Sequence, residues 1–306
     1  MKLYTLLATA LLSALPLCAM DWNPVSSGKW KKQDGEMSYE GTEFARLSAK
    51  KTMEENTFYR FSWQGRSSAP GAGKCLFQIV RDKKLAFLKD LTVGPEWQEN
   101  SAWFYSGVSG DAMVHFTVPG KTESNWNLRD FKIQKYTPDE MERLVWKDGF
   151  EGGSLPLNFY LKSTADGNSL KVAQDDSFIS GTQSLVFEVG ASTPRPDGIR
   201  SHYIPVLPGK TYSLTFWGKS VRELAVQAGI SIWPSSGRHT GKHIAQLQKF
   251  AFGPEWKKYT MEFTLPNDVS TYPDLNERSG QLIFMTSDSG ASGAISLDEI
   301  SLKVIR

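Results

Sequence analysis

The sequence has little cysteine, little excess charge and no long hydrophobic run beyond its first twenty residues. It contains two cysteines among 306 residues and carries a formal net charge of +2 at pH 7. No basic run is interleaved with aromatic residues, which argues against a nucleic-acid partner. After the N-terminal segment, no stretch reaches the roughly 18 uninterrupted apolar residues that a membrane helix needs, so no membrane span is expected.

The N-terminal stretch MKLYTLLATALLSALPLCAM has one Lys followed by an uncharged apolar run that ends in small residues. This pattern predicts a secretory signal peptide over residues 1–19, cleaved after Ala19, and therefore a secreted, periplasmic or cell-surface protein. A lipoprotein anchored at Cys18 is the less favoured alternative, because Leu17 is larger than the small residue expected before a lipidated cysteine. Cleavage leaves Cys75 alone, in the alternating stretch KCLFQIV, so we expect a buried, inert thiol and no disulfide.

The motifs of common catalytic sites are also missing. There is no phosphate loop, nucleophile elbow or cysteine–histidine pair. His239 and His243 lie four residues apart, but in a Gly- and Ser-rich loop without a helix to align them, so we interpret them as solvated rather than as zinc ligands. The one tight cluster of candidate catalytic side chains comprises Arg200, His202 and Tyr203.

The sequence does contain an internal repeat. The tetrapeptide GPEW occurs at 94–97 and again at 253–256. Three further landmarks recur in the same order, namely EGTEFARLSA (40–49) with SGTQSLVFEV (180–189), YRFSWQGRS (59–67) with YSLTFWGKS (212–220), and LRDFKI (128–133) with SLDEISL (296–302). The last pair aligns Asp130 with Asp298. Four matches in register indicate one duplicated module.

Both copies are predicted to be built of strands. Segments such as YSLTFWG and AVQAGISIW alternate apolar and polar residues, and turn sequences such as LPGKTY and SDSGASG separate them. We therefore predict an all-β protein with two tandem antiparallel β-sandwich (jelly-roll) domains. The first module is expected over 20–136 and the second over 148–306.

A short helical connector is predicted between the modules, over 137–147. In TPDEMERLV, Thr137 is the expected N-cap, Pro138 occupies the first helical position and Glu140 completes a capping box. The apolar face of this helix should pack on a module and fix the orientation of the two.

The second module resembles a known family. The stretches that carry the resemblance are DGFEGG (148–153), DSFISGTQSL (176–185), LPGKTYSLTFWGKS (207–220), FGPEWKKYTMEFTLP (252–266) and AISLDEISL (294–302). In this order they are similar to the calcium-containing jelly-roll carbohydrate-binding modules of the galactose-binding-like superfamily, families four, nine and twenty-two. The resemblance implies a β-jelly roll that binds a polysaccharide or other glycan and does no chemistry.

The resemblance also implies a structural calcium ion held by Glu151 and Asp298. The first and last strands of a jelly roll lie close together, so these acids, with backbone carbonyls from 176–182, would give the all-oxygen cage that calcium prefers. The alternative is that both acids cap strand ends in water. The first module keeps Asp130 but has no counterpart of the GFE stretch, which puts a calcium site there in doubt.

The tryptophans divide by strand face. Trp217 and Trp233 alternate with apolar neighbours and fall on polar faces, where exposed aromatics suit the apolar face of a sugar ring. With Lys219, Gln227 and Tyr203 they form the predicted glycan site. Contact between the two domains is the alternative role for both tryptophans.

The first module carries Gln64 where the second has its first platform tryptophan. Trp103 and Tyr105 are the predicted substitutes and form a secondary glycan site. Trp97 and Trp256, in the repeated turn, are interpreted as buried structural residues.

Three functions are therefore compatible with the sequence. The favoured one is an exported, non-catalytic glycan-binding protein, possible as an accessory to a glycoside hydrolase. The second is a jelly-roll polysaccharide lyase or hydrolase that uses the cluster of Arg200, His202 and Tyr203. The third is a structural surface or matrix protein whose modules bind protein partners. The identity of the glycan and the oligomeric state stay open.

Overall fold

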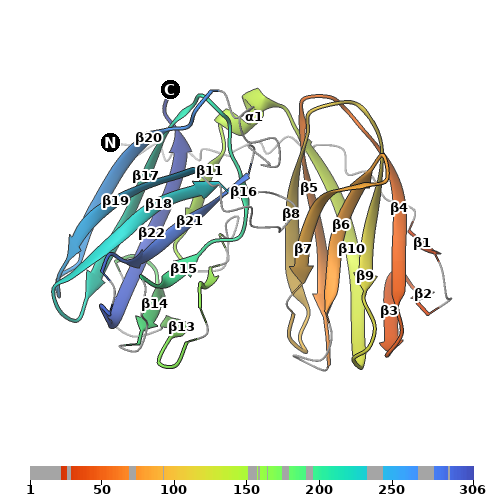
Figure 1. The fold of residues 1–306 in the computed structure, drawn as a ribbon, viewed down its shortest axis with the longest axis horizontal. Helices are drawn as coiled ribbons and strands as arrows, with labels where there is room; N and C mark the ends of the chain where they lie inside the picture. The colour runs from red at the N-terminus through yellow and green to blue at the C-terminus, as the bar shows by residue number, and fades with distance from the viewer. Residues whose placement is uncertain are drawn as a thin grey trace, which may run out of the picture.

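The computed structural model describes most of the chain after the predicted signal peptide. The described residues are 22–25, 29–68, 74–91, 93–150, 157, 159–163, 165–173, 179–190, 196–232, 244–267, 279–288 and 290–306. Residues 1–19, Glu151 and Trp233 lie outside them. The described residues form antiparallel strands and one short helix, arranged as two sandwiches side by side (Figure 1). The predicted all-β fold of two tandem β-sandwiches with a helical connector is therefore confirmed.

The first sandwich has two five-stranded sheets. Sheet A has the order β1 (Asn23–Val25), β4 (Ala45–Met53), β9 (Gly110–Val118), β6 (Cys75–Arg81), β7 (Lys84–Leu91). Sheet B has the order β2 (Lys31–Gln33), β3 (Glu36–Gly41), β10 (Ser124–Tyr136), β5 (Thr57–Arg66), β8 (Gln98–Ser106). Between them, Trp63 stacks on Phe77 with ring centroids 5.0 Å apart. Cys75 is buried, and burial raises the pKa of its thiol, as expected for an inert cysteine.

The second sandwich repeats this plan. Sheet C has the order β13 (Ser169–Ala173), β14 (Ser184–Val189), β22 (Gly293–Val304), β17 (Thr211–Ser220), β20 (Lys257–Thr264), and β11 (Val145–Asp148) also pairs with β22. Sheet D has the order β12 (Tyr160–Leu161), β15 (Gly198–Arg200), β21 (Ser279–Thr286), β18 (Leu224–Ile232), β19 (Ile244–Phe252), and β16 (Ile204–Pro205) also pairs with β21. Omitting β11 and β16, the two sandwiches have the same strand order, so the module is duplicated.

Backbone contacts explain why the GPEW turn recurs. The amide of Ser67, just after β5, donates to the carbonyl of Gly94 at 2.8 Å, and the amide of Ser220, at the end of β17, donates to the carbonyl of Gly253 at 2.8 Å. Each turn thus anchors the strand that follows it to the centre of its sheet. The repeat preserves a structural contact.

The strand registers correct one sequence alignment. Arg129 pairs with Gln64 just before a bulge in β10, and Asp298 pairs with Trp217 just before the equivalent bulge in β22. Asp130 therefore corresponds to Glu299, and both have positive φ angles, 55° and 47°. In the first module the place of Asp298 is taken by Arg129. The sequence match aligned Asp130 with Asp298 because both are Asp, although Asp130 lies one residue beyond the position that the strand register makes equivalent to Asp298.

The connector contains helix α1 (Pro138–Glu142), and its predicted capping box is present. Glu140 Oε2 accepts from the Thr137 amide at 2.6 Å, and Thr137 Oγ1 accepts from the Glu140 amide at 3.2 Å. Strand β11 begins at Val145 and belongs to the second sandwich. No helix in the described part of the chain is long and apolar enough to cross a membrane.

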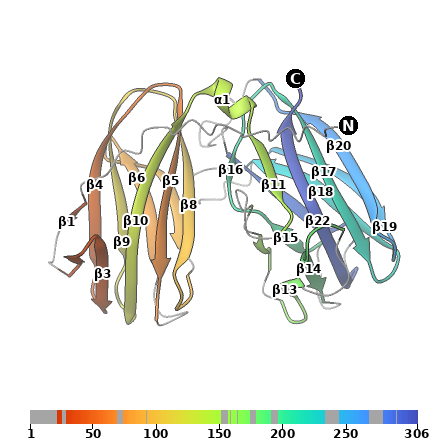
Figure 2. The same ribbon diagram turned by 180° about the vertical axis from the view of Figure 1, so that it is seen from behind.

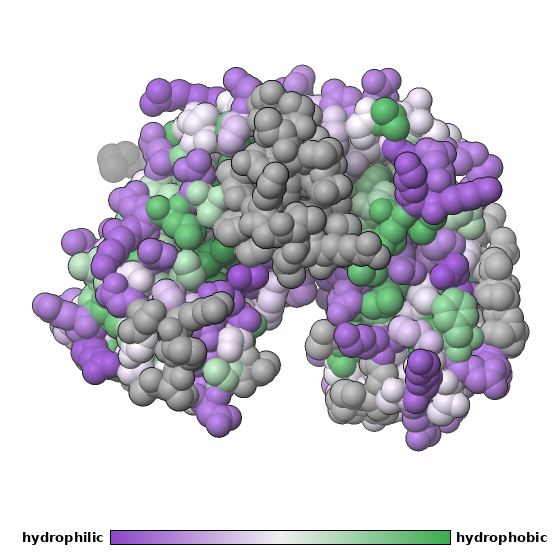
Figure 3. Space-filling model, in the orientation of Figure 1, coloured by the Kyte–Doolittle hydropathy of each residue, from purple (hydrophilic) through white to green (hydrophobic). Residues whose placement is uncertain are grey.

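The two modules pack against each other at the connector. Trp103 of β8 makes an edge contact with Trp146 of β11, with ring centroids 5.4 Å apart, and a tilted contact with Tyr136 at 5.1 Å. Phe58 and Met141 belong to the same buried cluster, which continues into the core of the second sandwich. Figure 2 shows α1 at the end of the molecule where the sandwiches meet. Figure 3 shows a notch between two largely hydrophilic lobes at the opposite end.

Candidate functional site

Trp217 lies on the outer face of sheet C, which we call the Trp217 face. Along β17, Leu214 and Phe216 point into the core and are fully buried, whereas Trp217 points outward and is half-buried. In register, Trp217 lies between Lys258 of β20 and Asp298 of β22. The alternation predicted from the sequence therefore places this ring as expected.

Trp256 shares the Trp217 face. The Nζ atom of Lys219 lies 5.0 Å from the centroid of the Trp256 ring, and both side chains are half-buried. Trp97, its counterpart in the first module, is half-buried too. The interpretation of Trp97 and Trp256 as buried core residues is therefore wrong. Both precede the strands at positions whose side chains point out of the sandwich, and a cationic side chain covers each ring.

The remainder of the Trp217 face is polar. Its half-buried or exposed positions around Trp217 include Thr215, Thr260, Ser296 and Ser301. Two aromatic rings on a sheet of hydroxyl and ammonium groups match the two sides of a pyranose, whose C–H face is apolar and whose rim carries hydroxyls. This surface is suited to an uncharged sugar chain.

Lys219 joins Trp217 as predicted, but Gln227 and Tyr203 do not. Gln227 lies on the outer side of β18 in sheet D, because its neighbours Val226 and Ala228 are buried in the core. The hydrophobic core therefore separates Gln227 from Trp217. Tyr203, which follows β15, is also on the sheet D side of the sandwich, and Trp233 lies outside the described residues. The residues predicted to form one glycan-binding surface are thus divided between the outer faces of sheets C and D. The alternation of apolar and polar residues along a strand shows which side chains point outward, but not to which sheet the strand belongs.

A second polar group of side chains lies at the sheet D edge nearest the first module. The rings of Tyr160 and His202 are 5.6 Å apart, and Gln281 Nε2 donates to Tyr160 Oη at 2.6 Å. Burial and the nearby charge of Lys89 lower the pKa of His202 to about 3, and burial with the neighbouring Tyr160 raises the pKa of Tyr203 to about 12. Both rings are therefore uncharged at neutral pH.

The module boundary accounts for Trp103 and Tyr105. Trp103 is 4% exposed and packed between modules, and Tyr105 packs on Phe58 at 4.8 Å while its Oη donates to Asn56. They do not form an open platform, which corrects the expectation of a secondary glycan site there. The sequence placed both on the outer face correctly but does not reveal that the second module covers this end of it.

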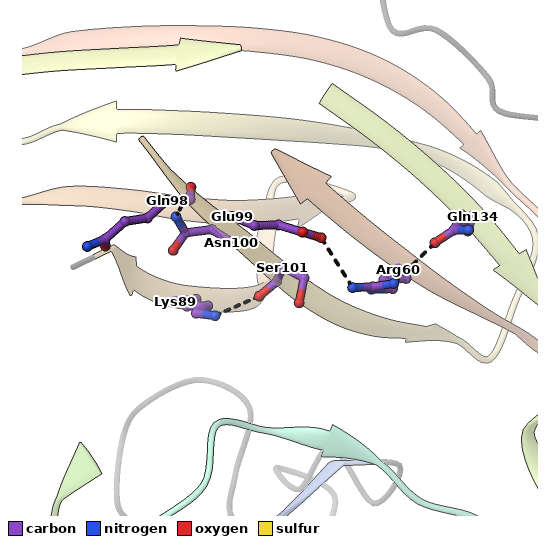
Figure 4. Close-up of polar contacts among 7 residues, drawn as sticks. All are labelled: Arg60, Lys89, Gln98, Glu99, Asn100, Ser101 and Gln134. Carbon is purple, nitrogen blue, oxygen red and sulfur yellow. Dashed lines mark hydrogen bonds and ion pairs between the residues drawn. The ribbon is translucent and has the colours of Figure 1, made fainter. Parts of the chain in front are cut away.

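Polar contacts continue along this edge of sheet B (Figure 4). Arg60 lies between Glu99 and Gln134, with nitrogen–oxygen distances of 3.6 and 3.5 Å. Lys89 Nζ donates to the carbonyl of Ser101 at 2.6 Å, and burial lowers the pKa of Lys89 to about 8. Of these side chains, Lys89 lies near the second module, since its charge acts on His202.

The candidate calcium ligands are only partly described. Asp298 is fully buried; its Oδ2 accepts from the amides of Ile179 (2.7 Å) and Ser180 (3.2 Å), and its Oδ1 from that of Glu299 (2.7 Å). Burial raises the pKa of Asp298, and burial and then the charge of Asp298 act to raise the pKa of Asp148. A buried carboxylate whose charge acts on a half-buried one is an arrangement that suits a hard cation. Asp148 was missed by the sequence analysis.

No cluster of three or more His, Cys, Asp and Glu side chains that would hold a metal occurs among the residues that the structure describes. Glu151 is outside those residues. A calcium ion at Asp298 would therefore depend on Glu151, Asp148 and backbone oxygens of the adjoining segments.

The fold defines a tandem β-sandwich protein, and the Trp217 face presents two half-buried aromatic rings on a polar sheet surface. A family model described as "Carbohydrate binding domain" matches residues 143–273, which confirms the resemblance of the second module to carbohydrate-binding modules. The match covers less than half of the chain. A search of the curated proteins found no match.

Several solved structures are similar to this chain. The N-terminal CBM22-1-CBM22-2 tandem domain of Paenibacillus barcinonensis Xyn10C is 12% identical, with 97% of this chain and 99% of that chain covered and a TM-score of 0.40. The C-terminal family 22 carbohydrate binding module of Clostridium thermocellum Xyn10B is 14% identical over 52% of this chain and 92% of that chain, with a TM-score of 0.39. The CBM22-2 xylan-binding domain of the Paenibacillus protein is 13% identical over 52% and 99%, with a TM-score of 0.40.

Proposed function

We propose that this is an exported, non-catalytic protein that binds polysaccharide through the Trp217 face of its second module. The observation that carries the proposal is the placement of Trp217 and Trp256, two half-buried rings beside Lys219 on an otherwise polar sheet face. The segment that contains them matches a carbohydrate-binding family model. Export is proposed from the apolar N-terminal segment, residues 1–19.

The chemistry of the face sets the expected binding. A sugar ring that stacks on an indole gains buried apolar area without a charged partner, so the affinity should depend little on salt. An open sheet face removes little water and does not offset the full entropic cost of association, so the affinity should be modest.

A structural calcium ion is part of the proposal for the second module. Asp298, Asp148 and Glu151 would hold it, and its charge would neutralise carboxylates that otherwise oppose folding. The ion would stabilise the fold, since Asp298 is buried and its carboxylate is held by the backbone amides of Ile179, Ser180 and Glu299.

A jelly-roll lyase or hydrolase is the alternative, with the cluster of Arg200, His202 and Tyr203 as its candidate machinery. The test is affinity electrophoresis of the mature chain through gels that contain different polysaccharides, with analysis of each polymer for new chain ends. Retardation without new chain ends supports the proposal. New chain ends that disappear in the His202→Gln variant would overturn it in favour of the enzyme. Passage through every gel without retardation would contradict glycan binding.

A further inference from the structure

The outer face of sheet B is the counterpart of the Trp217 face, but its chemistry differs. Where the second module has Trp217 paired with Asp298, the first has Gln64 paired with Arg129. The Lys219 position is taken by Arg66, because Gly65 and Gly218, which precede these two residues, pair with the equivalent leucines of β10 and β22. Only the turn tryptophan is kept. The first module has therefore exchanged an aromatic ring and a carboxylate for an amide and a guanidinium.

Two guanidinium groups lie against the Trp97 ring. The Cζ atom of Arg129 is 4.0 Å from the ring centroid, and that of Arg66 is 4.5 Å from it. Their side chains are 39% and 41% exposed. Stacking on an indole holds a guanidinium plane in place while leaving its N–H edge available to a ligand.

The orientation of Arg129 is fixed by a neighbouring amide. Its Nε donates to Gln64 Oε1 at 2.9 Å, and its contact with Asp130 also uses Nε, at 3.6 Å. Neither contact involves the two Nη groups. Gln64, in the place of the lost platform tryptophan, thus positions the guanidinium.

Nearby carboxylates do not use up these donors. Glu36 lies 3.8 Å from Arg66 Nη2, and the Asp130 contact is 3.6 Å long; both exceed the length of a charge-assisted hydrogen bond. Glu99, the cross-strand neighbour of Gln64, has Arg60 Nη2 as its cationic neighbour, at 3.6 Å. A guanidinium forms its strongest contact as a bidentate pair with a carboxylate. The Nη groups of Arg66 and Arg129 could form such a pair with a carboxylate on a ligand.

We propose that Trp97, Arg66 and Arg129 form a second binding site, which takes a carboxylate-bearing saccharide such as a uronate unit. The ligand carboxylate pairs with the Nη groups of the two arginines that lie over the Trp97 ring. The site is independent of the Trp217 face. Its affinity falls as salt rises, because both partners are charged and exposed.

The experiment titrates the mature full-length chain with polygalacturonate at low salt, with carboxyl-reduced polygalacturonate as the uncharged control polymer. The protein should bind polygalacturonate, lose most of the affinity at about 0.5 M salt, and bind the reduced polymer at least tenfold more weakly. Failure of the protein to bind polygalacturonate, or equal binding of both polymers, would overturn the site.

Variants locate the site. Arg129→Gln and Arg66→Gln should each weaken polygalacturonate binding about tenfold, and Arg129→Lys should weaken it too because the planar fork is lost. Lys132→Gln is the matched control, since it removes the same charge from an exposed position on the same strand. Unfolding midpoints of all variants are measured alongside. If Arg129→Gln and Arg66→Gln weaken polygalacturonate binding no more than Lys132→Gln does, the proposal is contradicted. Trp217→Ala, on the other module, should leave polygalacturonate binding unchanged.

Discussion

Arg129 in the first module occupies the position that Asp298 occupies in the second. Arg129 pairs with Gln64 and Asp298 pairs with Trp217, and each partner lies two residues before a cationic side chain that contacts the tryptophan of the GPEW turn. In both strands the following residue has a positive φ angle and lies in a bulge. Asp298 is buried and bound by three backbone amides, whereas Arg129 is half-exposed and stacked on Trp97. The two modules therefore carry side chains of opposite charge at this equivalent position, and we expect them to differ in metal and ligand binding.

Calcium should stabilise the second module through this position. With free calcium at about 100 times its dissociation constant, the bound ion contributes roughly 2.7 kcal/mol to the free energy of unfolding. Melting in calcium and in chelator should therefore differ for the wild type and for Asp130→Asn, the matched control. The difference should be largely absent in Asp298→Asn and Glu151→Gln. A shift of equal size in all four proteins would refute calcium binding here.

The contact between modules depends on Trp103. Because this ring is 4% exposed and touches Trp146 and Tyr136, Trp103→Ala should lower the free energy of unfolding by about 3–5 kcal/mol. Tyr105→Phe, which removes only the hydrogen bond to Asn56, should lower it by about 1 kcal/mol or less. Denaturant unfolding measures both. Equal effects of the two changes would show that the modules are not coupled through this ring.

Acid should weaken the protein partly through His202. The pKa of His202 is about 3 in the folded chain against a usual value of 6.5. Between these values the unfolded chain binds a proton that the folded chain does not, so stability falls as the pH falls, by at most about 1.4 kcal/mol per pH unit. His202→Gln should reduce this slope between pH 6.5 and 3, as followed by unfolding at a series of pH values. His115, whose pKa is also lowered, to about 4, by burial and then by Arg46, is present in both proteins and cancels. Unchanged slopes would contradict the burial of a neutral His202.

The two kinds of tryptophan should differ in what they stabilise. Trp63 is 1% exposed in the first core, so Trp63→Ala should cost about 3–5 kcal/mol of stability. Trp256 is half-buried on a surface, so the same change should cost clearly less, of which the contact with Lys219 accounts for about 0.5–1 kcal/mol. Chemical denaturation of the two variants is the comparison. A larger loss for Trp256→Ala would restore the interpretation of this residue as core.

Much of the fold was predictable because its signals are local. The two-residue alternation of YSLTFWG placed Trp217 outward and Phe216 inward, as observed, and the spacing of Thr137 and Glu140 predicted a capping box that is present. The duplication was legible because the GPEW turn makes the same backbone contact in both copies.

Relations between distant strands were not predictable in the same way. Nothing in the sequence of β18 says that Gln227 lies across the core from Trp217, since sheet membership is fixed by pairing far along the chain. The burial of Trp103 depends on the second module, and the correspondence of Asp298 to Arg129 rather than to Asp130 appears only in the pairing of these strands with Trp217 and Gln64. A sequence comparison without the register cannot show either.

The central claim is that polysaccharide binds on the Trp217 face. Isothermal titration of the mature chain with the most retarded polysaccharide, compared with Trp217→Ala and with Gln227→Ala on the opposite sheet, tests it most directly. We expect Trp217→Ala to weaken binding by about tenfold or more, equivalent to ~1.4 kcal/mol, and Gln227→Ala to bind as the wild type does, with unfolding midpoints confirming that both are folded. Full binding by Trp217→Ala together with loss in Gln227→Ala would contradict the account and move the site to the outer face of sheet D.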